Sequence, residues 1–151
     1  MEFFKTYFVL YNPEARFLCS KANQKNTDGD IGEMGKKLAE EIRYYIGFSF
    51  PNLDNLKKIT FLAHSLGGLI TRAALPLLDK YKGKMWSFIS LSSPHFGYMY
   101  SAGLISAGLW VLKKWYGAKS LEQLSFSDDK NPKHCFLYRL AMAQVSSLVK
   151  Q

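Results

Sequence analysis

The stretch "ITFLAHSLGGLITRAAL", residues 59–75, decides the fold of this 151-residue chain. Its first half is short, apolar and rich in β-branched and aromatic side chains, which predicts a buried strand over residues 57–63. Its second half predicts a helix over residues 67–78, with Pro76 distorting the helix end. Ser65 is therefore expected at a sharp turn between a strand and a helix.

A second buried strand is predicted for "MWSFISLS" at residues 85–92. Strand, helix and strand in this order form a unit that joins two parallel strands by a right-handed crossover. The fold class predicted is α/β, with a parallel sheet flanked by helices. Further helices are predicted at residues 30–46, 105–117 and 134–150 and a short strand at residues 15–20, whereas residues 3–11 fit either a helix or a strand.

The five residues that start at Ala63 fit a relaxed form of the G-x-S-x-G turn on which hydrolases carry a nucleophile. Small residues are needed two positions before and after the serine, and Ala63 and Gly67 supply them, with Gly68 extending the space. The pattern predicts that Ser65 is the nucleophile and that the backbone amide of Leu66 donates to the oxyanion. The alternative is an ordinary glycine-rich turn with a serine on the surface.

A serine nucleophile needs a base, and only His95 and His134 follow Ser65 in the chain. His95 lies directly after the second strand, but the only acid between it and Ser65 is Asp79, at a helix end. His134 follows the two aspartates at 128–129 in the usual order of a triad, yet it opens a helix instead of ending a strand. We expect His95 to shape the wall of the site and His134 to lie on the surface.

Four stretches together resemble the putative serine esterase family, a lipase-like domain, and in particular its version at the C-terminal end of large eukaryotic proteins. They are "ITFLAHSLGGLITRAAL", "SFISLSSPHFGYMYSAGLISAGLWVLKKW", "TDGDIGEMGKKLAEEI" and "SLEQLSFSDDKNPKHCFLYRL". The resemblance implies an α/β-hydrolase core, a carboxylic and lipid-like ester as substrate, and Ser65 as nucleophile. In that family the triad acid and histidine lie on later strands, and a His-Gly loop on an earlier one. Residues 1–151 are therefore expected to be a single partial α/β-hydrolase domain with an incomplete core. The isolated chain is expected to be inactive, as a fragment or as one part of a complex.

The remaining expectations come from composition. The formal net charge is +8, but the lysines are dispersed, which favours a solvated surface over a nucleic-acid partner. Two cysteines, Cys19 and Cys135, and the absence of a leader or spanning segment indicate an intracellular, cytoplasmic protein. Asp28 and Asp30 hint at calcium, but capping of a helix explains them better, so neither metal nor cofactor is expected.

The segment "GLISAGLWVLKKWYG" combines two tryptophans with two lysines on an amphipathic helix pattern. Such a helix suits a peripheral membrane contact or a lid, although packing on the core is the simpler interpretation. The rival to an enzyme is therefore a non-catalytic hydrolase remnant that uses residues 104–116 to bind a membrane or a protein.

Overall fold

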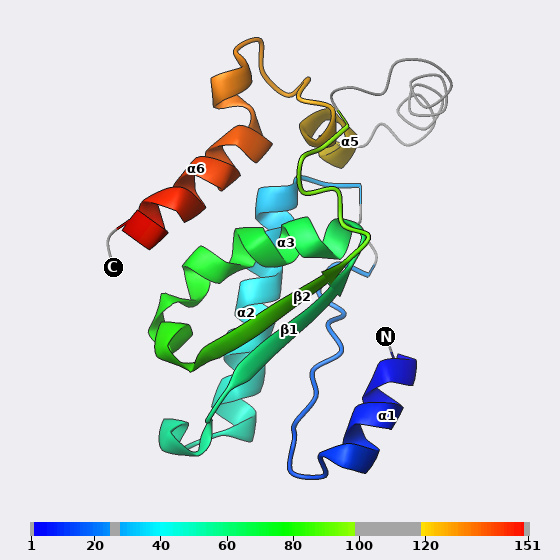
Figure 1. Cartoon of the computed structure of the whole chain (residues 1–151), viewed down its shortest axis with the longest axis vertical. Coiled ribbons are helices and arrows are strands. Elements are labelled where there is room, and N and C mark those ends of the chain that lie inside the picture. The colour runs from blue at the N-terminus through cyan, green and yellow to red at the C-terminus, as the bar shows by residue number, and fades with distance from the viewer. Residues whose placement is uncertain (1, 25–27, 99–118, 150–151) are drawn as a thin grey trace.

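The computed structural model describes residues 2–24, 28–98 and 119–149 (Figure 1). Within them a two-stranded parallel sheet is flanked by helices, which confirms the predicted α/β class. The helix predicted at residues 105–117 lies outside the described residues. The elements are, in chain order, α1 (Glu2–Tyr11), α2 (Ile31–Ser49), η1 (Leu53–Asn55), β1 (Ile59–His64), α3 (Leu66–Ala74), η2 (Leu75–Lys84), β2 (Met85–Leu91), α5 (Lys119–Leu124), η3 (Pro132–His134) and α6 (Phe136–Val149).

The strands β1 and β2 run parallel, and α3 and η2 connect them. The helix α3 ends directly before Leu75, and the backbone bends again inside η2 at Leu78. Pro76 explains this change because its ring removes a hydrogen-bond donor and clashes with the preceding turn. Because β1 and β2 run parallel, both strands end at the same edge of the sheet, where Ser65 and Ser92 follow them.

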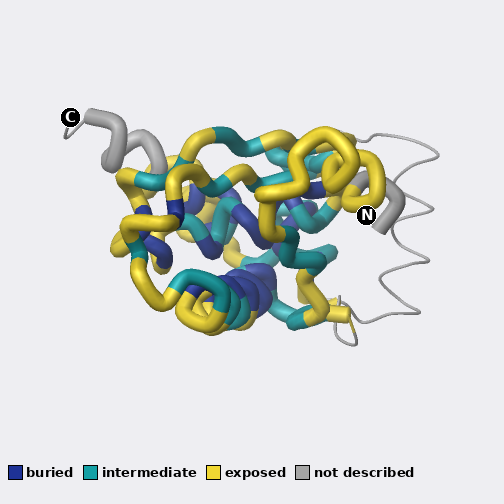
Figure 2. Tube along the Cα trace, turned by 90° about the horizontal axis from the view of Figure 1, so that it is seen from below, coloured by how far each residue is buried: buried dark blue, intermediate teal, exposed yellow. Residues whose placement is uncertain are grey.

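One face of the sheet packs against the helices. Alternate β1 residues, Ile59 and Phe61, contact the core, whereas Thr60 and His64, which belong to the other alternating set, are exposed. The helices α2 and α3 pack closely because Gly35 leaves room for Ala73: a Cβ at Gly35 would lie 2.6 Å from the Ala73 Cβ. Buried segments gather in the interior, with exposed segments around them (Figure 2). The largest core side chains that are fully buried are those of Ile31, Met34, Leu69, Leu78 and Cys135.

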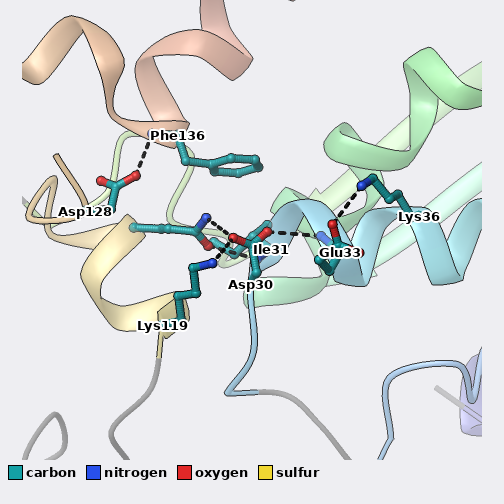
Figure 3. A network of polar contacts seen from close by, with 8 residues as sticks. Asp30, Ile31, Glu33, Lys36, Lys119, Asp128 and Phe136 are labelled. Atoms are coloured by element: carbon teal, nitrogen blue, oxygen red, sulfur yellow. Dashed lines mark hydrogen bonds and ion pairs between the residues drawn. The ribbon is translucent and has the colours of Figure 1, made fainter.

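The N-terminus of α2 is tied to α5 by a network of polar contacts (Figure 3). Asp30 caps α2 as predicted, since its carboxylate accepts a hydrogen bond from the Glu33 amide at 3.1 Å. The other oxygen accepts from Gln123 Nε2 and pairs with Lys119 Nζ, both at 3.0 Å. Gln123 Oε1 in turn accepts from the Ile31 amide at 2.8 Å. Gln123, 92 positions away in the chain, thus satisfies the Ile31 amide, whereas Asp30 satisfies the Glu33 amide locally.

The strand predicted at residues 15–20 is wrong, since this segment is irregular. A strand needs a neighbouring ladder to satisfy its backbone. The end of this segment is held by Glu41 of α2 instead of by a strand. The Lys21 amide donates to Glu41 Oε1 at 2.9 Å, and the Ser20 hydroxyl donates to the other carboxylate oxygen. Residues 3–11, which fit either a helix or a strand, lie in α1.

Candidate functional site

Ser65 occupies the single-residue junction between β1 and α3. Its backbone has φ 53° and ψ −131°, a combination that L-residues rarely adopt and that costs about 1–3 kcal/mol. The residue is exposed, and its side chain makes no capping hydrogen bond to α3. The Ser65 side chain is therefore neither part of a regular helix nor packed into the core.

Two backbone hydrogen bonds hold this turn. The Ser65 amide donates to the carbonyl of Leu91, the last residue of β2, at 2.9 Å. The Ser65 carbonyl accepts from the Gly68 amide at 3.1 Å, in the first turn of α3. The position of Ser65 thus depends on the end of the neighbouring strand as well as on its own helix.

The closest approach in this region is at Gly68. A Cβ on Gly68 would lie 2.2 Å from Ser93 Oγ and 2.6 Å from Ser90 Oγ, distances that atoms cannot occupy. A Cβ on Gly67 would meet only the Ala63 Cβ, at 4.0 Å, which is ordinary contact. The sequence pattern placed the main steric demand at Ala63 and Gly67, whereas in the structure the glycine that touches the next strand is Gly68.

Leu66 is the first residue of α3, and its half-buried side chain packs against the core. Amides in the first turn of a helix have no acceptor within the helix, and the helix dipole places positive charge there. An amide at this position suits a developing negative charge next to Ser65.

His95 is held by both of its ring nitrogens. Nε2 lies 2.8 Å from Ser90 Oγ, and Nδ1 lies 3.4 Å from Arg72 Nη1, which also reaches the His95 carbonyl at 3.4 Å. Burial, and then the nearby Arg72 guanidinium, lower the pKa of His95 below its usual value of 6.5. Both nitrogens already have partners, so this geometry does not present His95 as a base for Ser65. It lies in the loop after β2, as expected, and its role in the wall of the site stays a prediction.

Arg72 and Ser90 were not identified from the sequence. Arg72 lies four residues after Gly68 in α3, and Ser90 lies one residue before the end of β2. Helical spacing from Gly68 would have placed Arg72 near the end of the sheet, and the strand register would have placed Ser90 there. Neither pattern indicates that these side chains contact His95.

His134 lies on η3, between α5 and α6, and not at the end of a strand. Its Nδ1 is 3.8 Å from Asp129 Oδ1, and its side chain is 67% exposed. Asp128 bonds to the Phe136 amide at 2.7 Å at the start of α6. Asp79 is exposed on η2. Among the described residues, no hydrogen bond joins His95 or His134 to Ser65, so the structure brings together the turn but no triad.

The part of the chain that the structure describes contains no group of three histidine, cysteine or acidic side chains that could hold a metal ion. Asp30, the carboxylate considered for calcium, caps α2 instead. Burial alone would raise the pKa of Asp30, but hydrogen bonds from Lys119 and the Glu33 amide outweigh it, and the pKa is lowered. No described helix has both the length and the apolar character needed to cross a bilayer.

Comparison with known proteins identifies one family. A family model described as "Putative serine esterase" matches residues 1–150, which is nearly the whole chain. No solved structure matches the chain. The rival membrane-binding segment, residues 104–116, lies outside the described residues.

Proposed function

We propose that this chain, which belongs to the putative serine esterase family, is a serine ester hydrolase domain with Ser65 as its nucleophile. The observation that carries the proposal is the backbone of Ser65, with φ 53° at the junction between β1 and α3. Strained backbone of this kind clusters at functional sites, and the α/β-hydrolase turn uses it to expose a serine above the sheet between a strand and a helix.

In the proposed reaction Ser65 Oγ attacks the carbonyl carbon of an ester, and a base takes the hydroxyl proton. The Leu66 amide stabilises the negative charge on the former carbonyl oxygen. The alcohol leaves, and water then releases the acid from Ser65. His95 and His134 have partners elsewhere, so we place the base outside the described residues. Without a base the reaction slows by several powers of ten, roughly 10³ or more.

We propose lipid esters as the substrate class. Apolar side chains are exposed around the end of β2, close to the carbonyl that holds Ser65: Ile89 is 44% exposed, Leu91 39% and Phe96 92%. A contiguous exposed apolar patch marks a ligand-binding or membrane contact site, and we propose that these side chains form one.

Neither cysteine forms a disulfide; Cys19 is half-buried and Cys135 is buried. Free thiols are typical of proteins in reducing compartments. They support the cytoplasm as the proposed place of action.

The direct test is covalent labelling of the purified chain with a fluorophosphonate at high probe concentration and long incubation, because a serine without its base reacts slowly. We expect slow labelling of the wild-type chain at Ser65, located by peptide mass spectrometry, and its loss in Ser65→Ala. Ser92→Ala is the matched control, because Ser92 is an exposed serine with φ 51° directly after β2. Equal labelling of Ser65→Ala and the wild-type chain would refute the assignment.

A second candidate function is non-catalytic docking on an anionic membrane surface. Trp86 is 67% exposed, and Lys58 Nζ lies 3.4 Å from the centre of its ring. An indole beside an ammonium group suits the interface between lipid and water, and the net charge of +8 favours anionic lipid. A wild-type chain that stays unlabelled yet co-sediments with phosphatidylserine vesicles would establish this function in place of the hydrolase.

A further inference from the structure

Three elements meet at the His95 side chain. His95 lies in the loop after β2, and its ring contacts Ser90 of β2 and Arg72 of α3. Phe88 of β2 packs edge-on against the ring, with ring centres 6.2 Å apart. We name the set Arg72, His95 and Ser90 the His95 clamp. It joins the helix that follows Ser65 to the strand that pairs with β1.

The donors and acceptors in the clamp determine the protonation state of the ring. Arg72 can only donate hydrogen bonds, so Nδ1 of His95 must be the acceptor and carries no proton. The proton is then on Nε2, which donates to Ser90 Oγ at 2.8 Å. We assign the neutral Nε2–H form to His95 on this basis.

The clamp is linked to Ser65 through a short path. Leu91 accepts the hydrogen bond from the Ser65 amide and follows directly after Ser90. Gly68 lacks a side chain, so Ser90 and Ser93 lie against the first turn of α3. A shift of the loop after β2 therefore moves the carbonyl that holds the Ser65 backbone.

We propose that His95 is a positioning residue for the reaction at Ser65, because the His95 clamp fixes the loop after β2 against α3. The inference rests on the proposed function of Ser65, and it assigns His95 no contact with the substrate. A displacement of about 1 Å in a reactive group costs up to about 10²-fold in rate, so a partial loss of positioning has a measurable effect.

The clamp also predicts a dependence on pH. The charged group that faces His95 is Arg72 from α3, and the groups of β2 against the ring, Phe88 and Ser90, are uncharged. Protonation at Nδ1 turns an acceptor into a donor and places two positive groups together. His95 has a lowered pKa, so the clamp is complete at and above about pH 6.5. It is lost as the pH falls through the lower pKa of the folded protein.

The test compares fluorophosphonate labelling of the full chain at pH 5 to 8, with the maximal rate and the affinity for the probe measured separately. We expect His95→Ala to lower the maximal rate by about tenfold with little change in affinity. His95→Gln keeps a donor for Ser90 without a titrating ring, so it restores most of the rate. In the plot of labelling rate against pH, the rate of His95→Gln also falls less steeply toward low pH than the rate of the wild-type chain. His134→Ala is the matched control, because that histidine is exposed on η3.

A second variant, Ser90→Ala, keeps the ring and removes its acceptor, so the inference stays testable if His95→Ala unfolds. Wild-type rates in both His95→Ala and Ser90→Ala would overturn the inference while leaving Ser65 as the nucleophile. A His95→Gln rate as low as that of His95→Ala would also overturn it, since support of the fold alone would then explain the loss. Failure of the wild-type chain to label would instead refute the proposed function, and this inference with it.

The tautomer can be checked without any reaction. Nitrogen-15 shifts of the imidazole distinguish a bare Nδ1 from a protonated one. We expect Nδ1 to be unprotonated at pH 7 and the titration midpoint of His95 to lie below the usual value of 6.5 for histidine. Protonation at Nδ1 at pH 7 would contradict the clamp.

Discussion

Adjacent glycines in the first turn of α3 are predicted to respond oppositely to the same substitution. Gly68→Ala introduces a methyl group at 2.2 Å from Ser93 Oγ and 2.6 Å from Ser93 Cβ. Rotation of the serine side chain moves Oγ but leaves Cβ in place, so the loop after β2 itself has to move. Gly67→Ala introduces the same methyl group 4.0 Å from the Ala63 Cβ, which is an ordinary van der Waals contact.

The magnitude follows from two opposing effects. Alanine stabilises a helix interior by about 1 kcal/mol relative to glycine, and this gain applies to both variants. Overpacking of a close contact costs about 1–3 kcal/mol, and only Gly68→Ala incurs it. The difference in the free energy of unfolding between the two variants is therefore about 1–3 kcal/mol, with Gly68→Ala the less stable. For a chain of this size, each kcal/mol shifts the melting temperature by roughly 2–4 °C.

Urea unfolding followed by circular dichroism measures this difference, and an unchanged slope with urea concentration shows that both variants unfold like the wild-type chain. Gly67→Ala serves as the matched control for helix propensity, since it lies in the same turn. Equal stability of the two variants, or a more stable Gly68→Ala, would show that α3 does not pack against the end of β2 as described.

Two further predictions concern the buried polar groups. Gln123→Ala removes the partner of the buried Ile31 amide and a donor to Asp30, so we expect a loss of about 2 kcal/mol in urea unfolding. A loss below roughly 0.5 kcal/mol would mean that α5 does not cap α2. Cys135 has no exposed surface, and burial raises the pKa of its thiol, so DTNB should react rapidly only with Cys19 in the native chain. Equal rates at Cys19 and Cys135 would contradict the packing around α6.

Local patterns predicted much of the fold. Asp30 and the helical spacing after it predicted α2, and the structure confirms the cap. The apolar runs on either side of the glycine-rich turn predicted β1, α3 and β2 in that order. These signals act within a few residues, through propensity and capping, so they can be recognised without knowing what packs nearby. The segment at residues 15–20 failed because a strand also needs a partner, and no local signal shows whether one is present.

The arrangement around Ser65 was only partly accessible in this way. The motif identified the serine and the small residues near it, but it pointed to Gly67 where the close contact is at Gly68. The function of Ser65 and of the Leu66 amide stays a prediction. The partners of His95 could not be foreseen, because Arg72 is 23 positions away from it in the chain and belongs to another element.

By itself the sequence determined the order of β1, α3 and β2, the cap of α2 and the position of a serine between a strand and a helix. Only the tertiary structure decided which glycine lies against β2, which side chains hold His95 and how α5 completes the N-terminus of α2. The physical reason is the distance along the chain over which each interaction acts. Propensities and caps involve neighbours in the chain, whereas parallel pairing of β1 with β2 brings distant residues within hydrogen-bond distance only after the chain has folded.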